Sequence, residues 1–338
     1  MTPAIISADS HLDLGWLPAD TFTSRVPGPL RERAPRVVET DGGPTWVADG
    51  VVLSGVAGVG SRGRPYRPGR WQRADRMAAT GLYSDGLFRP ANPDERWRDQ
   101  ERDGVAGEVL YGLFGVSAAL RDDELAAAID VAFNDWLVEF CAHDPRRYVG
   151  LACLPAHDAR AAAHEISRTA DMGLAGGVLD VKNGYRPLWH PDWDPVWAAA
   201  EECDYPISFH SSAKRVEGDG VQVMGTMAAP EGEAMVEAAI GMSLLQFHGS
   251  ADYFAIIFGG ALDRFASLKI VLGESGIGWI PSMLDRMDWQ YDNEFRDLGL
   301  KLKPSEYWHR QMYATFQSDL VGMHLIDFLG DGHVMYAS

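Results

Sequence analysis

The chain has 338 residues, 46% hydrophobic and 23% charged, with a formal net charge of −18, a balance that suits a globular protein and repels the phosphate backbone of nucleic acids. No apolar run approaches the roughly 20 residues that a membrane span needs, and the first residues lack the basic stretch and apolar core of a signal peptide. The three cysteines are too few and odd in number for a disulfide framework, so we expect reduced thiols in a cytoplasmic protein.

The first predicted element is a short strand that ends in two potential metal ligands. An apolar run at residues 4–6 leads into Asp9 and His11, which lie two residues apart. Because side chains alternate along a strand, the carboxylate and the imidazole point to the same side. Both groups bind divalent metals. Trp16 follows closely and is a candidate wall for an aromatic substrate, although tryptophan is also common in cores.

A long segment at residues 12–97 separates this strand from the rest of the chain. It is rich in Pro, Gly and Arg, and it also carries four tryptophans. The segment is too long for an ordinary loop and too aromatic for a disordered one. We therefore predict an irregular cap that is inserted beside the first strand.

The remainder of the chain alternates between strand and helix patterns. The predicted strands cover residues 107–112, 148–153, 176–182, 206–210, 269–274, 311–317 and 333–338. The predicted helices cover residues 96–103, 122–142, 158–172, 194–203, 232–262, 279–291 and 323–328. Strands that alternate with helices pair in parallel through right-handed crossovers. Together with the first strand they make eight units, which predicts an α/β fold with a single (β/α)8 TIM-barrel domain.

Such a barrel would gather the polar ends of its strands at one mouth, where these folds keep their active sites. His210 ends the fifth strand, and two imidazoles and a carboxylate form a ligand set typical of zinc, manganese or iron. We therefore predict a metal bound by Asp9, His11 and His210. Glu274 ends the sixth strand among small glycines and is a candidate metal ligand or general acid or base, or else a partner of the following helix N-terminus. Trp279 is a second candidate aromatic wall.

Further polar residues near this mouth are candidates for catalysis or substrate binding. His248 lies on the predicted helix after the fifth strand, where it could reach the site or serve as a core or surface histidine. Asp180 and Lys182 end the fourth strand, where they would bind substrate or pair with each other. Gln317 ends the seventh strand and has the same two alternatives.

Several short motifs, taken in order, resemble the amidohydrolase-related family, in the branch that contains aminocarboxymuconate-semialdehyde decarboxylase and related aromatic-acid decarboxylases. The motifs are Asp9-Ser-His11, Arg102-Asp-Gly104, Asn134-Asp-Trp136, Pro155, Pro195-Val-Trp197, Phe209-His210, Phe258-Gly-Gly260 and Glu274-Ser-Gly-Ile-Gly-Trp279. The likeness covers essentially the whole chain apart from the cap. It implies a barrel of the metal-dependent hydrolase type that holds one divalent ion, which we expect to be zinc, and a homodimer.

The resemblance implies a carboxy-lyase, that is, a non-oxidative decarboxylase of a small aromatic or unsaturated carboxylic acid. One departure is Glu274, which stands where these decarboxylases carry a catalytic histidine and favours a hydrolase of an amide, lactone or ester. Another is the family's aspartate ligand after the eighth strand, which we expect, with the last helix, beyond Ser338. The substrate would then be a small carboxylate or acyl compound. A catalytically inactive barrel with a binding role is the remaining alternative.

Overall fold

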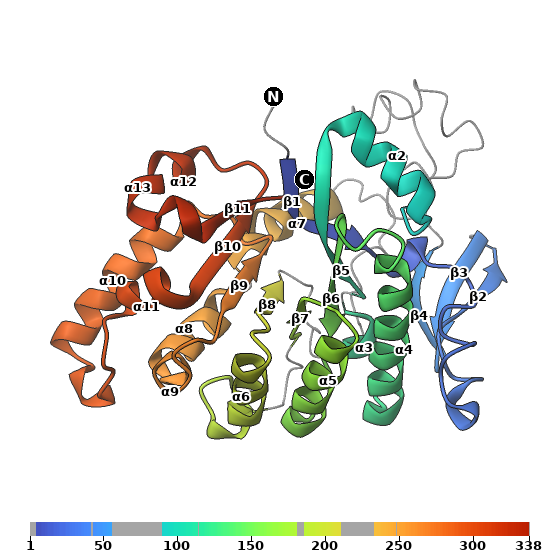
Figure 1. Cartoon of the computed structure of the whole chain (residues 1–338), viewed down its shortest axis with the longest axis horizontal. Helices are drawn as coiled ribbons and strands as arrows, with labels where there is room; N and C mark the ends of the chain where they lie inside the picture. The colour runs from blue at the N-terminus through green and yellow to red at the C-terminus, as the bar shows by residue number, and fades with distance from the viewer. Residues whose placement is uncertain are drawn as a thin grey trace.

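In the computed structural model of the protein, the described residues are 5–41, 43–55, 90–113, 115–180, 186–210, 233–247 and 249–337. Their centre is a sheet of eight parallel strands (Figure 1). The strands are β1 (Ile5–Leu12), β5 (Val105–Gly112), β6 (Tyr148–Cys153), β7 (Gly176–Val178), β8 (Ile207–His210), β9 (Ile270–Gly273), β10 (Met312–Phe316) and β11 (Val334–Tyr336). Hydrogen bonds link them in chain order, and the two outer strands, β1 and β11, lie side by side. The predicted eight-stranded barrel is confirmed.

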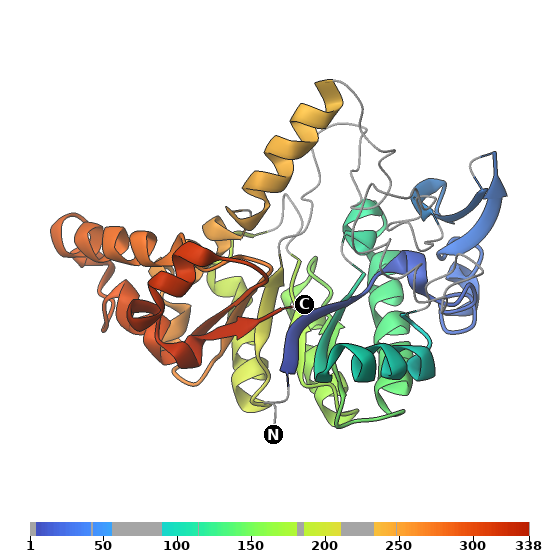
Figure 2. The ribbon, with the colours of Figure 1, turned by 90° about the horizontal axis from the view of Figure 1, so that it is seen from above.

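Helices follow the strands and surround most of the barrel (Figures 1 and 2). They are α2 (Pro93–Asp103), α3 (Val116–Ala119), α4 (Asp123–Cys141), α5 (Ala159–Asp171), α6 (Asp194–Glu202), α7 (Glu233–Leu244), α8 (Ser250–Phe258), α9 (Ala261–Arg264), α10 (Ile280–Asn293), α11 (Pro304–Gln311), α12 (Leu320–His324) and α13 (Ile326–Leu329). Asp122 begins α4 by accepting hydrogen bonds from two backbone N–H groups, and Asp158 begins α5 in the same way. Gly104 ends α2 with a φ of 73°, a conformation that glycine adopts without strain.

The barrel wall separates two apolar clusters. The inner cluster is formed by Val109, Tyr111, Leu151 and Val178. Leu110, next to Tyr111 on β5, belongs instead to the larger cluster between the strands and the helices. This change of side at consecutive residues follows from the alternation of side chains along a strand. Inner-facing residues at the C-terminal ends of the strands therefore face the mouth of the barrel.

The segment between β1 and α2 contains regular structure that the sequence analysis did not predict. It holds the 3₁₀ turns η1 (Leu14–Trp16) and η2 (Gly28–Leu30) and an antiparallel sheet of β2 (Arg36–Thr40), β3 (Gly43–Ala48) and β4 (Val51–Gly55). Asp49 and Gly50 connect β3 to β4 with positive φ angles of 49° and 77°. An Asp-Gly pair between strand-forming residues is the sequence signal for such a hairpin. The prediction of an irregular segment is therefore wrong for residues 36–55, and residues 56–89 lie outside the described part.

Other differences from the sequence analysis concern the bounds of elements. The long helix predicted at residues 232–262 is divided into α7, the 3₁₀ turn η4 (Leu245–Phe247), α8 and α9, and Gly260 precedes α9 with a φ of 69°. The helix α11 was not predicted, although Pro304 at its first position is favourable for a helix start. Short 3₁₀ turns also occur at η3 (Pro191–Trp193), η5 (Arg296–Leu298) and η6 (Asp331–His333). Within the described residues, none of the helices combines the length and apolar character needed to cross a membrane.

Candidate metal centre

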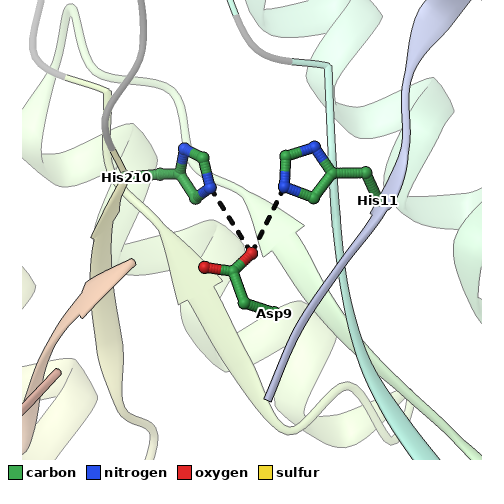
Figure 3. Close-up of side chains that lie close together, drawn as sticks. All are labelled: Asp9, His11 and His210. Atoms are coloured by element: carbon green, nitrogen blue, oxygen red, sulfur yellow. Dashed lines mark ion pairs between the residues drawn. The ribbon is translucent and has the colours of Figure 1, made fainter. Parts of the chain in front are cut away.

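Three side chains meet at the C-terminal end of the barrel strands (Figure 3). Oδ1 of Asp9 lies 3.3 Å from Nε2 of His11 and 3.4 Å from Nε2 of His210. Asp9 and His11 project from β1 and His210 ends β8, and these strands are not neighbours in the sheet. Closure of the barrel therefore brings together the three residues that the sequence analysis predicted as metal ligands.

The second oxygen of Asp9 is held by two hydrogen-bond donors. The backbone N–H of Glu274 donates to Oδ2 at 2.8 Å, and the hydroxyl of Thr315 donates to it at 2.7 Å. Oδ1 is buried and faces the two imidazoles without a hydrogen bond of ordinary length. A buried acceptor atom in this state, with two ring nitrogens converging on it, is the arrangement that a bound cation would complete.

Contacts on the far side of each imidazole fix its direction. Oδ1 of Asp13 lies 3.3 Å from Nδ1 of His11, and a carboxylate at one ring nitrogen directs the other toward a metal. The ring of His210 packs against that of Tyr111, with centroids 5.1 Å apart. A Cβ atom at Gly273 would lie 2.8 Å from Cδ2 of His210. Glycine is therefore required at position 273 for the ring to keep this place.

The electrostatics of Asp9 and His11 favour a bound cation. Burial alone would raise the pKa of Asp9, but its interactions with His11 and His210 outweigh this effect and hold the pKa well below its usual range. Burial opposes the charged form of His11, yet the neighbouring carboxylates of Asp13 and Asp9 raise its pKa to about 10. Metal ligands must be deprotonated, so a divalent ion would bind in place of the proton on His11.

Glu274 lies at the rim of this site, as expected for a residue that follows the sixth strand of the barrel. Its Oε2 is 3.8 Å from Nε2 of His210, and Gln317 donates a hydrogen bond to its Oε1 at 3.4 Å. The φ angle of Glu274 is 48°, which is uncommon for a residue with a Cβ atom. The hydrogen bond from its backbone N–H to Asp9 stabilises this conformation. One turn therefore presents a main-chain donor to Asp9 and a carboxylate to the mouth.

The two predicted aromatic walls occupy different positions. Trp16 ends η1, five residues after His11, and is half-buried. Trp279 precedes α10, donates a hydrogen bond from Nε1 to the carbonyl oxygen of Ser275 at 2.9 Å, and packs against Phe247 at 5.8 Å between ring centroids. These contacts show that Trp279 joins α10 to η4. A contact of either tryptophan with substrate stays a prediction.

The other predicted residues are only partly described. Asp180 lies two residues beyond β7 and lines a pocket together with Asp130 and Cys153. Gln317 is exposed and its bond to Glu274 places it at the mouth. His248 and Lys182 lie outside the described residues.

Two residues of the site were missed by the sequence analysis. Tyr111 lies opposite His11 in the register of β1 and β5, and its hydroxyl forms a 2.8 Å hydrogen bond with Ser208 of β8. Thr315, on β10, is fully buried and holds Asp9. Both occupy inner positions near the ends of strands that were predicted. Their signal is the strand period, which identifies the inner face only once the register of the barrel is known.

A parallel eight-stranded barrel with a carboxylate and two imidazoles converging at its mouth defines the class of metal-dependent barrel enzymes. Residues 87–338 match the amidohydrolase family, and the chain belongs to that family. It is 30% identical over 256 residues to gamma-resorcylate decarboxylase from Rhodococcus jostii (strain RHA1), and the matched region covers 68% of this chain and 72% of the relative. The predicted membership of this superfamily of enzymes is confirmed.

Solved structures agree on the fold. An amidohydrolase from Mycobacterium avium subsp. paratuberculosis K-10 is similar with a TM-score of 0.69 and 19% identity, over 99% of this chain and 88% of that chain. A dihydroxybenzoic acid decarboxylase from Polaromonas sp. JS666, with bound manganese and the inhibitor 2-nitroresorcinol, is similar with a TM-score of 0.59 and 19% identity, over 77% of this chain and 78% of that chain.

Proposed function

We propose that the protein is a metal-dependent, non-oxidative decarboxylase of a small aromatic carboxylic acid that carries a hydroxyl group beside the carboxylate. The observation that carries this proposal is the convergence of Asp9, His11 and His210 at the mouth of the barrel. The chain that builds this site is 30% identical to a decarboxylase of gamma-resorcylate. The fold alone supports many reactions, so the site and the relative are needed together.

The residues fit one divalent cation. Asp9, His11 and His210 each offer one ligand atom, and these atoms lie within 4.8 Å of one another. A cation bound there supplies Lewis-acid polarisation of the oxygen atoms of the substrate. Zinc is our prediction from the residue types, whereas the similar Polaromonas enzyme contains manganese. Both ions accept a mixed set of imidazole and carboxylate ligands.

Glu274 is the residue that we assign to proton transfer. Decarboxylation breaks the bond between the ring carbon and the carboxylate, and the electron pair left on the ring carbon takes up a proton as carbon dioxide leaves. The carboxyl group of Glu274 lies beside His210 at the rim of the proposed metal site, where it is partly exposed. Gln317 holds Oε1 of this carboxyl by a hydrogen bond. Tyr111 and Val178 supply apolar surface inside the barrel that excludes water from the aromatic ring of the substrate.

A direct assay tests this proposal. The purified protein is loaded with Mn²⁺ or Zn²⁺ and incubated with 2,6-dihydroxybenzoate and other hydroxybenzoates, and carbon dioxide and the phenolic product are quantified. We expect equal amounts of both products, no turnover in His210→Ala, and a loss of about 10²-fold or more in kcat with unchanged metal content in Glu274→Gln. Hydrolysis of lactones, esters or amides without release of carbon dioxide would replace the decarboxylase with a hydrolase. Substoichiometric metal and no turnover would leave a barrel with a binding role.

We also propose that the protein is a homodimer, as the resemblance to this family implies. We propose a cytoplasmic location because the low cysteine content suits a reducing compartment. Sedimentation equilibrium at several protein concentrations measures the mass of the assembly. A single species of monomer mass at all concentrations would contradict the dimer.

A further inference from the structure

We propose that Arg96 and Glu108 are positioning residues for the metal centre, because their buried ion pair fixes the bulged stretch of β1 from which Asp9 and His11 project. The inference rests on the proposed metal site and adds residues that neither touch the cation nor line the mouth.

The strand β1 is irregular immediately before and at the metal ligands. Ser7 pairs with Glu108 of β5, whereas Ser10 pairs with Leu110, so β1 uses one residue more than β5 over this stretch. Residues three apart in a regular strand point to opposite faces. Here the hydroxyls of Ser7 and Ser10 meet at 2.9 Å, because the extra residue turns both to the outer face. The same irregularity leaves the intervening Asp9 directed into the barrel (Figure 3).

Glu108 joins this stretch of β1 to helix α2. Its Oε1 accepts a hydrogen bond from the hydroxyl of Ser10 at 3.3 Å. Its Oε2 accepts hydrogen bonds from Nε of Arg96 at 2.5 Å and from Nε2 of Gln100 at 2.8 Å. Arg96, Gln100 and Glu108 are 8%, 3% and 9% exposed, so water competes little for these contacts. Both carboxylate oxygens are therefore occupied, and the position of Ser10 is tied to α2.

Arg96 makes a second contact with the ligand strand. Its Nη1 donates a hydrogen bond to the backbone carbonyl oxygen of His11 at 3.1 Å and another to that of Pro90 at 3.3 Å. One guanidinium group therefore reaches the main chain of a metal ligand directly and, through Glu108 and Ser10, the residue between the two ligands of β1. The planar, forked group of arginine suits this geometry, which the single ammonium of lysine does not reproduce.

The energetics favour a positioning role over a contribution to stability. Removing two charges from water costs several kcal/mol for each, and well-packed apolar residues of the same volume often stabilise a fold as well or better. Most of this layer is packed by apolar side chains, such as Leu110 beside Glu108. The charged contact between Arg96 and Glu108 lies next to the irregular stretch of β1, to which both residues are hydrogen-bonded. We infer that it keeps the ligands close to their binding geometry before the cation arrives.

The test measures cation affinity and stability in the same variants. The double variant Arg96→Met/Glu108→Gln removes both charges together, so that neither is left buried alone, and Arg96→Lys keeps the charge without the fork. Binding of Mn²⁺ is followed by electron paramagnetic resonance, and unfolding is followed in urea. We expect the Kd for Mn²⁺ to rise about tenfold or more in the double variant, as for other residues that orient metal ligands. In the single variant Arg96→Lys the Kd should also rise, but by less.

A matched control uses a second buried acid far from the ligand strand. Glu165 on α5 is 3% exposed and pairs with Arg168 at 2.7 Å and with Asn134 at 2.7 Å. Glu165→Gln should lower the stability but leave the Kd for Mn²⁺ unchanged. The inference is overturned if the folded double variant binds Mn²⁺ as the wild type does, or if Glu165→Gln weakens binding equally. A wild-type protein that binds no divalent cation would instead refute the proposed metal centre.

Discussion

Replacing Thr315 with valine tests how strongly the metal centre depends on the hydroxyl that holds Asp9. The Thr315 hydroxyl is fully buried, donates to Oδ2 of Asp9 at 2.7 Å and accepts the backbone N–H of Glu274 at 2.7 Å. Valine has nearly the same shape, so Thr315→Val removes these hydrogen bonds without opening a cavity. Asp9 keeps the donor from Glu274. A hydrogen bond to a charged group contributes about 1.5–3 kcal/mol, so the free energy of unfolding should fall by about 2 kcal/mol.

The same substitution should weaken cation binding about tenfold, because it removes one of the two donors that hold Oδ2 of Asp9 and thereby direct Oδ1 to the imidazoles. Urea unfolding of the metal-free protein measures the first effect, and titration with Mn²⁺ against a competing chelator measures the second. Thr315→Ser retains the hydroxyl and should bind as the wild type does. Equal affinities for wild type and Thr315→Val, or equal losses in the valine and serine variants, would refute the reasoning.

Three further predictions follow from the contacts of the site and its rim. His210→Ala should lose bound metal while retaining cooperative unfolding, and metal retained after dialysis would exclude His210 as a ligand. Gly273→Ala should displace the His210 ring and weaken Mn²⁺ binding about tenfold or more. Gly28→Ala is the control, because a Cβ atom there would meet no atom within 4 Å, and it should leave binding unchanged. Burial raises the pKa of Asp319, but three backbone N–H groups outweigh it and hold the pKa below its usual range. Its contribution to stability is therefore present above pH ~4 and is lost as the pH falls through the lowered pKa of the folded protein. Asp319→Asn should cost about 1 kcal/mol at pH 7 and progressively less as acid protonates Asp319, and a pH-independent difference would contradict this.

The barrel and the meeting of three candidate metal ligands at its mouth could be predicted because they depend on patterns within single segments. The strand at residues 148–153 was predicted with the bounds that the structure shows, since it is a short apolar run stopped by Pro155. Asp9, His11 and His210 were identified because polar residues at the ends of parallel strands must share one mouth. Their convergence needed no knowledge of register.

The residues that were missed depend on contacts between segments. Thr315 and Tyr111 look like ordinary strand residues until the register shows that they face inward beside Asp9 and His11. Arg96 and Glu108 pair across 12 positions, from a helix to a strand, and nothing in either segment predicts this. The hairpin at Asp49 and Gly50 is different, since its signal is local, but it lies within a segment whose overall composition is irregular.

The turn at Glu274 gives two roles to one residue, one to its main chain and one to its side chain. Asp9 is held by the main-chain N–H of this residue, which every amino acid except proline can supply. The side chain at the same position is directed to the mouth and is 25% exposed. A substitution at position 274 can therefore change the side chain at the mouth while the hydrogen bond that holds Asp9 persists. Chains that share this arrangement of Asp9, His11 and His210 can differ in chemistry at this one position.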